Sequence, residues 1–352
     1  MLQEKNVNIK RKRTVIFIFI VIIYLLYYCL LDKDKFAKSY IMKKDKIVVK
    51  APATIANVSC GFDILGLAIE QPFDLVSINK NTLSKLAIKS IEPNFLDLPV
   101  DINKNTASVA VRALLETLGS SQGFDISIVK GVPACGGMGS SAASAAAAVF
   151  AANELLGKPF SSMDLIPFAM EGEKVAAGSA HADNVAPSIV GGMTLIRSYD
   201  PLDIIMLSNN LDLFCVVVHP NIQVKTKDAR DVLPTSVPFS TLVKQSGNIA
   251  SLVHGITKGD LNIIGSSMHD AIVEPVRASL IPGFSDVKQA AMNSGAIGCS
   301  ISGSGPSVFA FSSDLITSER ISKSMQGMFK SLKITSTAYI SKVNNLGCEI
   351  VS

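Results

Sequence analysis

The stretch VPACGGMGSSAASAAAAVFAANELLG, residues 132–157, decides the fold. Its glycines Gly136, Gly137 and Gly139 can adopt positive φ and let the backbone approach a ligand closely. The alanine-rich part predicts a helix that begins at Ser140, and unpaired N–H groups at a helix start bind phosphate. No Lys follows the last glycine, so the loop is not a Walker A loop. The stretch indicates either a phosphate-binding loop or a Ser-capped helix in a packing region.

Strands and helices alternate on both sides of this stretch. Apolar patterning predicts strands at 46–50, 124–129 and 211–218, and a strand–glycine loop–strand at 296–311. Helical spacing is found at 105–118, 140–156, 161–177, 238–255, 262–273 and 285–294. Residues 51–65 are expected to be rich in turns. Interleaved strands and helices favour an α/β or α+β fold over a helical bundle or a β-sandwich.

Length and composition exclude several classes of protein. A chain of 352 residues corresponds to about two domains. With 48% hydrophobic and 18% charged residues, it is not disordered, collagenous or coiled coil as a whole. Residues 1–46 carry a net charge of +7 and the remainder −3, so a broad nucleic-acid-binding surface is not implied. Six cysteines without a C-x-x-C pair are predicted to be reduced and mostly buried.

Residues 1–41 differ from the rest of the chain. Val15–Leu31 is an uncharged run preceded by Arg11, Lys12 and Arg13, which is typical of a short membrane-spanning helix with its basic end in the cytoplasm. A signal peptide is a second interpretation, although no small-residue cleavage site follows. A third is upstream sequence wrongly joined to a protein that starts at Met42. The three interpretations stay open.

The glycine-rich stretch resembles the signature loop of the GHMP kinases, P-x-x-x-G-L-G-S-S-A-A. The matching residues are Pro133, Gly137, Met138, Gly139, Ser140, Ser141, Ala142 and Ala143. Residues 50–67 (KAPATIANVSCGFDILGL) resemble the opening of the homoserine kinases within that family. Residues 171–192 contain their H-x-D-N-V-A-P segment, and residues 300–311 resemble the last family motif.

This resemblance implies an α+β GHMP kinase fold. An N-terminal α/β domain like ribosomal protein S5 domain 2 is expected at 46–205, and a ferredoxin-like C-terminal domain at 206–352. The implied reaction transfers the γ-phosphoryl group of ATP to the hydroxyl of L-homoserine, with Mg²⁺ as cofactor, in threonine biosynthesis. Alternatives are another small-molecule GHMP kinase of the mevalonate type, or a catalytically silent, membrane-anchored nucleotide-binding protein.

The resemblance also implies partners and location. L-Homoserine and ATP are the expected ligands, with no nucleic acid and a membrane only if residues 1–41 are real. A cytoplasmic homodimer is expected.

The same resemblance assigns the ATP and metal sites. The triphosphate is expected on residues 133–143, which also include Ala134, Cys135 and Gly136. Glu173 and Ser141 are expected to hold Mg²⁺, which prefers oxygen ligands and often takes only one or two from protein. Glu171 is expected to be the exposed neighbour of Glu173.

L-Homoserine carries an ammonium, a carboxylate and a hydroxyl group. Asn57 and Asp63 lie six residues apart in one loop and are expected to meet the ammonium and the hydroxyl. Arg230 and Arg277 match family positions that bind the carboxylate, for which arginine offers two parallel donors.

Three residues are predicted to act in catalysis: Asp63, Glu173 and Asn184. His181 is expected either to bind substrate as a hydrogen-bond donor to phosphate, to act as a general base, or to be a structural histidine in a turn. Asn184 stands where related sugar and mevalonate kinases have an aspartate base. Without a clear base, the hydroxyl can attack directly, with its proton passing to the phosphate or to Asp63.

Overall fold

The computed structural model describes residues 45–94, 97–178, 180–208, 212–224 and 226–352, and these belong to one compact unit, Asp45–Ser352. The predictions for residues 1–41 lie outside the described residues. In the described ranges, no helix is both long and apolar enough to span a bilayer. The cysteines described there are free thiols, and all except Cys135 are buried, as predicted.

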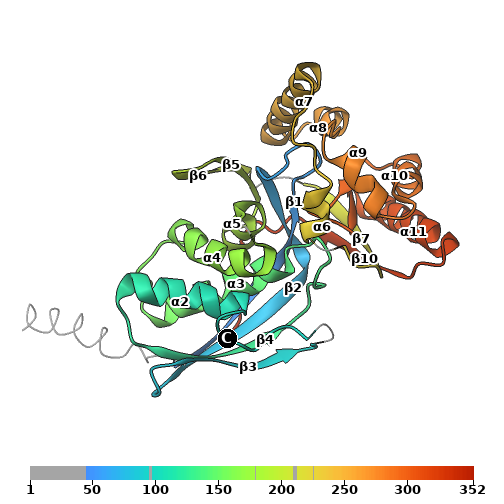
Figure 1. The fold of residues 1–352 in the computed structure, drawn as a ribbon. Coiled ribbons are helices and arrows are strands. Elements are labelled where there is room, and N and C mark those ends of the chain that lie inside the picture. Colours follow the sequence, from blue (N-terminus) through green and yellow to red (C-terminus); the bar gives the residue numbers. More distant parts are fainter. Residues whose placement is uncertain (1–44, 95–96, 179, 209–211, 225) are drawn as a thin grey trace, which may run out of the picture. The chain divides into compact units, whose positions relative to one another are not determined.

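A seven-stranded sheet forms the larger part of the unit (Figure 1). Its path runs β11-β1-β2-β4-β3, and β5 pairs with both β2 and β6. Only β3 and β4 are parallel among these pairs. The strands are β1 (Lys46–Ala56), β2 (Leu65–Asn81), β3 (Leu86–Glu92), β4 (Gly123–Val129), β5 (Met193–Tyr199), β6 (Leu202–Ser208) and β11 (Glu349–Ile350).

The turn-rich stretch predicted from residue 51 onward is wrong for residues 51–56, which belong to β1. Residues 51–56 continue β1 instead of turning, and all six residues are buried, so both faces of this part of the strand are covered. Pro52 lacks an N–H group, and the register shifts between Pro52 and Ala53. A register shift of this kind accommodates a proline in a strand.

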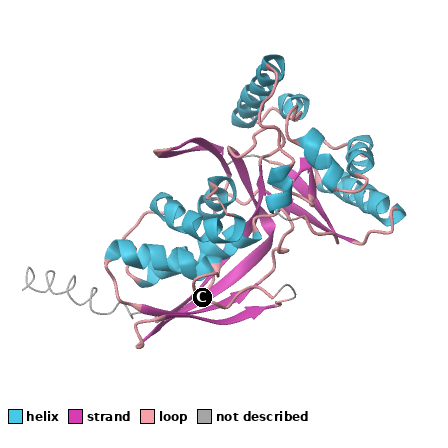
Figure 2. Ribbon diagram, in the orientation of Figure 1, coloured by secondary structure: helices cyan, strands magenta, loops and turns pink. Residues whose placement is uncertain are grey.

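Four helices cover one face of this sheet (Figures 1 and 2): α2 (Thr106–Leu118), α3 (Ser140–Leu155), α4 (Ile166–Ala177) and α5 (Ala182–Val190). α3 packs against β1, β2, α2, α4 and α5. Its many alanines fit this position, since small side chains let all these neighbours approach. The helices predicted at 105–118 and 140–156 are confirmed, whereas α4 starts after a 3₁₀ turn at Met163–Leu165.

A second, antiparallel sheet has the order β10-β7-β9-β8. Its strands β7 (Phe214–Pro220), β8 (Gly298–Ile301), β9 (Val308–Ser312) and β10 (Ser336–Lys342) combine with α10 (Phe284–Asn293) and α11 (Leu315–Ser331). This β-α-β-β-α-β arrangement is the predicted ferredoxin-like one. Cys215 and Val217 belong to the main core and Val216 and Val218 to a second core, which explains the continuous apolar run of β7.

Four more helices lie in the connection from β7 to β8 within this second sheet: α6 (Thr226–Asp231), α7 (Phe239–Lys258), α8 (Leu261–Ser267) and α9 (Glu274–Arg277). The helix predicted at 262–273 is wrong beyond Ser267. Asp270 accepts hydrogen bonds from the N–H groups of Ile272, Val273 and Glu274, and these bonds start α9 instead. The domain division between residues 205 and 206 stays a prediction.

Candidate active site

The glycine-rich loop joins β4 to α3, and two of its glycines cannot be replaced without collision. Gly137 and Gly139 have φ of 73° and 68°. A Cβ on Gly139 would lie 2.0 Å from Thr54 Oγ1, and one on Gly137 would lie 2.4 Å from the carbonyl oxygen of Ser302. The third positive φ of the loop is at Cys135, at 55°, and not at Gly136. The loop backbone therefore lies close to Thr54 and Ser302, whereas its predicted approach to a ligand stays a prediction.

A second glycine loop, between β8 and β9, touches the first. Ser302 Oγ donates a 2.7 Å hydrogen bond to the carbonyl of Gly137, and the N–H of Ser307 donates to the carbonyl of Gly136. The two glycine loops therefore lie in direct contact. The contact brings the edge of the ferredoxin-like sheet against the start of α3.

A buried ion pair holds the start of α3. The side chain of Asp74 on β2 is fully buried and pairs with Lys130. Lys130 Nζ also donates to the carbonyl of Ser140, at 2.8 Å, and to Ser144 Oγ, at 2.9 Å. The N–H groups of Gly131 and Val132 both donate to Asp74 Oδ1. These contacts fix both ends of the loop.

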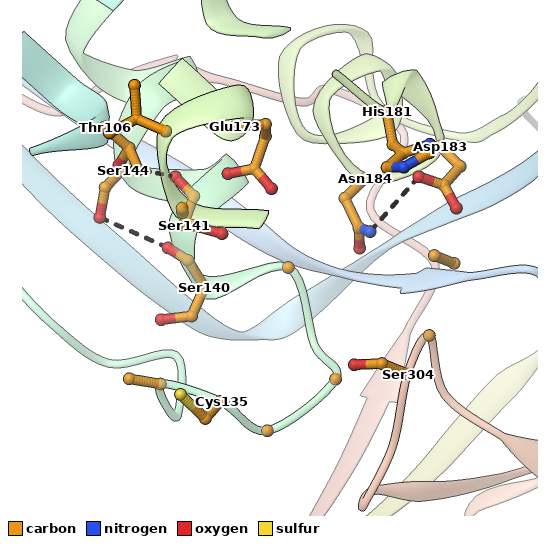
Figure 3. A pocket seen from close by; sticks show the side chains of 18 of the residues that line it. Thr106, Cys135, Ser140, Ser141, Ser144, Glu173, His181, Asp183, Asn184 and Ser304 are labelled. Atoms are coloured by element: carbon orange, nitrogen blue, oxygen red, sulfur yellow. Dashed lines mark hydrogen bonds between the residues drawn. The ribbon is translucent and has the colours of Figure 1, made fainter. Parts of the chain in front are cut away.

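Glu173 on α4 is a buried carboxylate beside Ser141 (Figure 3). Burial raises the pKa of Glu173 to about 7, whereas a hydrogen bond with Ser141 and the charge of Lys130 act in the opposite direction. Within the described part of the chain, Oε1 of Glu173 has no hydrogen-bond partner. A buried, half-satisfied carboxylate next to a hydroxyl suits a hard cation, because both groups offer oxygen ligands.

Asp63 is held from several sides. Arg230 Nη2 donates to both of its carboxylate oxygens, at 2.9 and 3.1 Å, and His181 Nδ1 lies 3.7 Å from Oδ1. The N–H of Asp63 donates to Asn57 Oδ1, and Tyr199 donates to its carbonyl at 2.7 Å. Burial and the charge of Arg230 lower the pKa of His181, and the charge of Asp63 opposes them.

Asn57 is occupied inside the protein. Besides accepting from Asp63, its Nδ2 donates to the carbonyl of Gly303 at 2.9 Å. Asn57 therefore connects the loop of Asp63 to the loop between β8 and β9, and this internal role was not expected from the sequence.

The two predicted arginines, Arg230 and Arg277, both lie beside the ring of Phe62. The guanidinium carbons of Arg277 and Arg230 lie 5.0 and 5.6 Å from the centre of its ring. Arg277 is buried and donates to the carbonyls of Ala229 and Gly303. Burial, with the nearby charge of Arg230, lowers the pKa of Arg277 to about 10, so it stays cationic near neutral pH. The two guanidinium groups concentrate positive charge beside this ring, and Asp63 pairs with one of them, Arg230.

Asp183 is a buried acid at the start of α5, and it is the aspartate of the H-x-D-N-V-A-P segment, to which the sequence assigned no role. Burial raises its pKa to about 7, and the negative charges of Asp63 and Glu173 add to this effect. Its neighbour Asn184 accepts a 2.7 Å hydrogen bond from Thr54 Oγ1. Figure 3 shows His181, Asp183 and Asn184 grouped opposite Glu173 and Ser141.

The glycine loop, Glu173, Asp63, Asp183 and the two arginines line one pocket of about 530 Å³. The predicted residues that line it are Asn57, Asp63, Ala134, Cys135, Gly136, Gly137, Gly139, Ser140, Ser141, Glu173, His181, Asn184, Arg230 and Arg277. Pro133, Met138, Ala142 and Ala143 do not line it, and Met138, Ala142 and Ala143 are core residues. The contact of these four residues with ATP stays a prediction.

The pocket has an apolar end that the sequence did not reveal. It is lined by Ile91, Leu98, Pro99 and Ile128, which come from β3, β4 and the segment before α2. No motif marks these residues, because ordinary core strands carry the same residue types.

The raised pKa of Asp183 predicts a pH dependence of stability. Between about pH 4 and about pH 7 the folded chain holds a proton on Asp183 that the unfolded chain releases, so this contribution is lost as pH rises through about 7. Relative to Asp183→Asn, the wild type should lose roughly 1–3 kcal/mol of unfolding free energy between about pH 5 and about pH 7.5. Denaturant unfolding of both proteins, without nucleotide or metal, measures this difference. Parallel curves for the two proteins would contradict it.

Comparisons with known proteins agree with this geometry. The family descriptions "GHMP kinases N terminal domain" and "GHMP kinases C terminal" match residues 105–192 and 252–331. Homoserine kinase from Chlorobium phaeobacteroides is 48% identical over 313 residues, which is 86% of this chain and 98% of that protein. The chain belongs to the GHMP kinase family. The α+β fold and the family predicted from the motifs are thereby confirmed.

Within the GHMP kinases, the close relatives share one name. Homoserine kinase from Chloroherpeton thalassium is 47% identical, over 85% of this chain and 94% of that protein. A crystal structure of homoserine kinase from Cytophaga hutchinsonii matches with a TM-score of 0.85 and 49% identity, over 88% of this chain and 98% of that one. This GHMP kinase therefore shares fold and sequence with homoserine kinases over nearly the whole described unit.

Proposed function

We propose that this GHMP kinase transfers the γ-phosphoryl group of ATP to the side-chain hydroxyl of L-homoserine. One observation carries the proposal: a single pocket joins a glycine loop at a helix start to a pair of arginines on Phe62 and a set of buried acids. The first feature suits a polyphosphate, and the others suit a small molecule with both an anionic and a cationic group.

ATP is assigned to the glycine-loop side of the pocket. The first N–H groups of α3, from Ser140 onward, have no carbonyl within the helix to bond, and the helix dipole adds positive potential there. The apolar end at Ile91, Leu98 and Ile128 suits a flat purine ring. Ser140 has a supporting part, because its hydroxyl donates to the carbonyl of Val132 at 2.8 Å and closes the loop.

Glu173 and Ser141 are the residues that would hold Mg²⁺. Bound there, the metal would supply positive charge against the phosphate oxygens. No cluster of three His, Cys, Asp or Glu ligands occurs in the part of the chain that the structure describes. A site with one carboxylate and one hydroxyl is in keeping with Mg²⁺, which usually fills its shell with phosphate and water.

The amino acid is assigned to the opposite side. Arg230 and Arg277 bind its carboxylate, since both guanidinium groups lie beside the ring of Phe62 at the pocket. Asp183 binds its ammonium, because this buried acid lies among other negative groups and a cation would relieve that repulsion. Asp63 is already bound by Arg230 and serves chiefly to orient it.

Phosphoryl transfer then needs alignment more than a strong base. The substrate hydroxyl oxygen forms a bond to the γ-phosphorus as the bond from that phosphorus to the β–γ bridging oxygen breaks, and ADP leaves. The hydroxyl proton passes to the transferred phosphate. Asn184, fixed by Thr54, stands beside the reacting groups as a neutral amide and orients the hydroxyl.

Asp63→Asn separates binding from proton transfer. If Asp63 orients Arg230, the substitution should raise the KM for L-homoserine by roughly 10- to 100-fold, since it removes charge-assisted bonds, and leave kcat within a few-fold. Steady-state kinetics at saturating ATP measure both constants. A fall in kcat of roughly 10²-fold or more with an unchanged KM would instead make Asp63 the base.

The direct test is ADP release with L-homoserine, mevalonate or no acceptor. Rapid ADP release with L-homoserine alone supports the proposal, and a preference for mevalonate would replace it with a mevalonate-type activity. ATP binding without turnover of any acceptor would favour a silent nucleotide-binding protein. A homodimer and a cytoplasmic location remain predictions, which size-exclusion chromatography and cell fractionation would test.

A further inference from the structure

Gln245 on α7 is a buried amide outside the pocket. Its side chain is on a helix whose outer residues Phe239 and Val243 are exposed, but Gln245 itself is only 5% exposed. It is absent from the pocket lining, and no motif in the sequence marks it. A buried amide needs hydrogen-bond partners, so its partners show what it does.

The amide of Gln245 bonds to two segments that both carry substrate-side residues. Its Nε2 donates to the carbonyl of Cys60, at 2.8 Å, and to Asp270 Oδ1, at 3.1 Å. Its Oε1 accepts from the N–H of Ala271 at 2.8 Å. All the hydrogen-bonding capacity of the NH₂ group is thus used in joining residue 60 to residue 270.

The first of these segments carries Phe62 and Asp63. Cys60 immediately follows Asn57, Val58 and Ser59, which all have positive φ, at 69°, 41° and 68°. Non-glycine residues keep such angles only where the surroundings enforce them, and a buried β-branched Val58 is a clear outlier. The hydrogen bond from Gln245 to Cys60 is one of the contacts that hold this turn.

The second segment carries Arg277. Asp270 accepts the N–H groups of Ile272, Val273 and Glu274, and the N–H of Arg277 donates to the carbonyl of Val273 at 3.0 Å. The position of Asp270 therefore sets where the single turn of α9 begins. Since Arg277 stacks on Phe62, the two segments must keep a fixed spacing for the arginine to meet the ring.

We propose that Gln245 is a positioning residue for the amino-acid side of the pocket. By joining Cys60 to Asp270, it sets the spacing between Phe62 and Arg277 and hence the affinity for the substrate carboxylate. None of the hydrogen bonds of Gln245 reaches the glycine loop or Glu173, so the KM for ATP should change much less than the KM for L-homoserine. This inference rests on the proposed function for its kinetic test.

The test uses Gln245→Glu and Gln245→Met in the full chain, with Asn248→Asp as control. The Glu variant keeps an acceptor for the N–H of Ala271 but replaces the donor NH₂ with an oxygen, which the carbonyl of Cys60 and the carboxylate of Asp270 repel. The Met variant removes the hydrogen bonds without adding a charge. Asn248 lies one turn further on α7 and donates to the carbonyl of His269 at 2.7 Å. Its substitution loosens the same helix but leaves the hydrogen bonds from Gln245 to Cys60 and Asp270 in place.

Both Gln245 variants should raise the KM for L-homoserine by roughly 5- to 50-fold, with the KM for ATP within about two-fold of wild type. Asn248→Asp should leave both constants within about two-fold. A purely structural role would lower the active fraction, and so the apparent kcat, without separating the two KM values. Equal changes in both KM values, or a homoserine KM no higher than in Asn248→Asp, would overturn the inference.

Hydrogen exchange gives a readout that needs no substrate. In Gln245→Met, amides of residues 57–65 and 270–277 should exchange faster than in wild type, whereas those of 131–143 should not change. Unchanged exchange in the first two segments would refute the positioning role. If the wild type turned over no L-homoserine, the proposed function would fail, and this exchange measurement would still decide the role of Gln245.

Discussion

Glu173→Gln is expected to lower kcat by roughly 10²- to 10⁴-fold while leaving the fold intact. The carboxylate is 7% exposed, and one of its oxygens has no partner in the described chain. Burial raises its pKa to about 7, which means that the fold disfavours the charged form of this side chain. A neutral amide of the same shape keeps the packing but loses the negative charge that would hold Mg²⁺ in the proposed site.

Stability should move in the opposite direction from activity in this variant. Because the charged form is penalised by burial, replacing it with an amide should leave the Tm unchanged or raise it in the absence of ligands. The measurements are kcat at saturating ATP, Mg²⁺ and L-homoserine, and the Tm of the ligand-free protein. Loss of activity together with a large fall in Tm would point to a structural role instead.

Glu171→Gln is the matched control. Glu171 lies on the same helix two residues earlier, its side chain is 52% exposed, and its contact with Lys174 is 3.9 Å. Exposed pairs of this kind contribute little, so both kcat and Tm should stay close to wild type. A kcat for Glu173→Gln within ten-fold of that of this control would remove Glu173 from the catalytic site.

The parts of the site that lie in continuous motifs could be predicted from the sequence. The glycine loop, the start of α3 at Ser140 and the loop between β8 and β9 are short local patterns whose backbone geometry depends on glycine. The ferredoxin-like sheet was implied by the family resemblance, and only its strand–glycine loop–strand, β8 and β9, is a local pattern of this kind. Local signals of this kind depend little on what packs against them.

The parts that depend on pairing of distant residues could not be predicted. Asp183 looks like one polar residue among several, and its raised pKa comes from burial and from Asp63 and Glu173, which no local pattern connects to it. Residues 51–56 read as turns because Ala51 and Pro52 are poor strand formers, yet pairing with β2 makes them a strand. Gln245 gives no signal at all, because its role lies only in its partners.

The pair Asp74–Lys130 is another contact without a local signal. Asp74 lies in β2, Lys130 directly follows the neighbouring strand β4, and no motif includes either residue. The sequence predicted what the glycine loop binds and left open what fixes it. The four donors around Asp74 supply that answer: Lys130, Ser144 Oγ and the N–H groups of Gly131 and Val132.

Asp74→Asn should destabilise the protein by about 3–5 kcal/mol, because it leaves the Lys130 ammonium buried without a counter-charge. An asparagine Oδ1 can still accept from Gly131 and Val132, but its Nδ2 would face Lys130 and Ser144, where donor meets donor. Thermal unfolding should show a Tm lower by roughly 5–15 °C. The KM for ATP should rise by about ten-fold or more, since the loop is fixed through Lys130 and Ser140.

Two further variants decide whether the buried charge is the cause. Asp125→Asn removes a partly exposed acid of β4 whose contact with Lys89 is 3.3 Å, and it should cost less than about 1 kcal/mol. Adding Lys130→Met to Asp74→Asn removes the uncompensated ammonium, so part of the lost Tm should return, whereas the KM for ATP should stay high because the contact with Ser140 is gone. If the double variant were less stable than Asp74→Asn, the lysine would stabilise the loop mainly through its hydrogen bonds to Ser140 and Ser144, and its charge pairing with Asp74 would matter less.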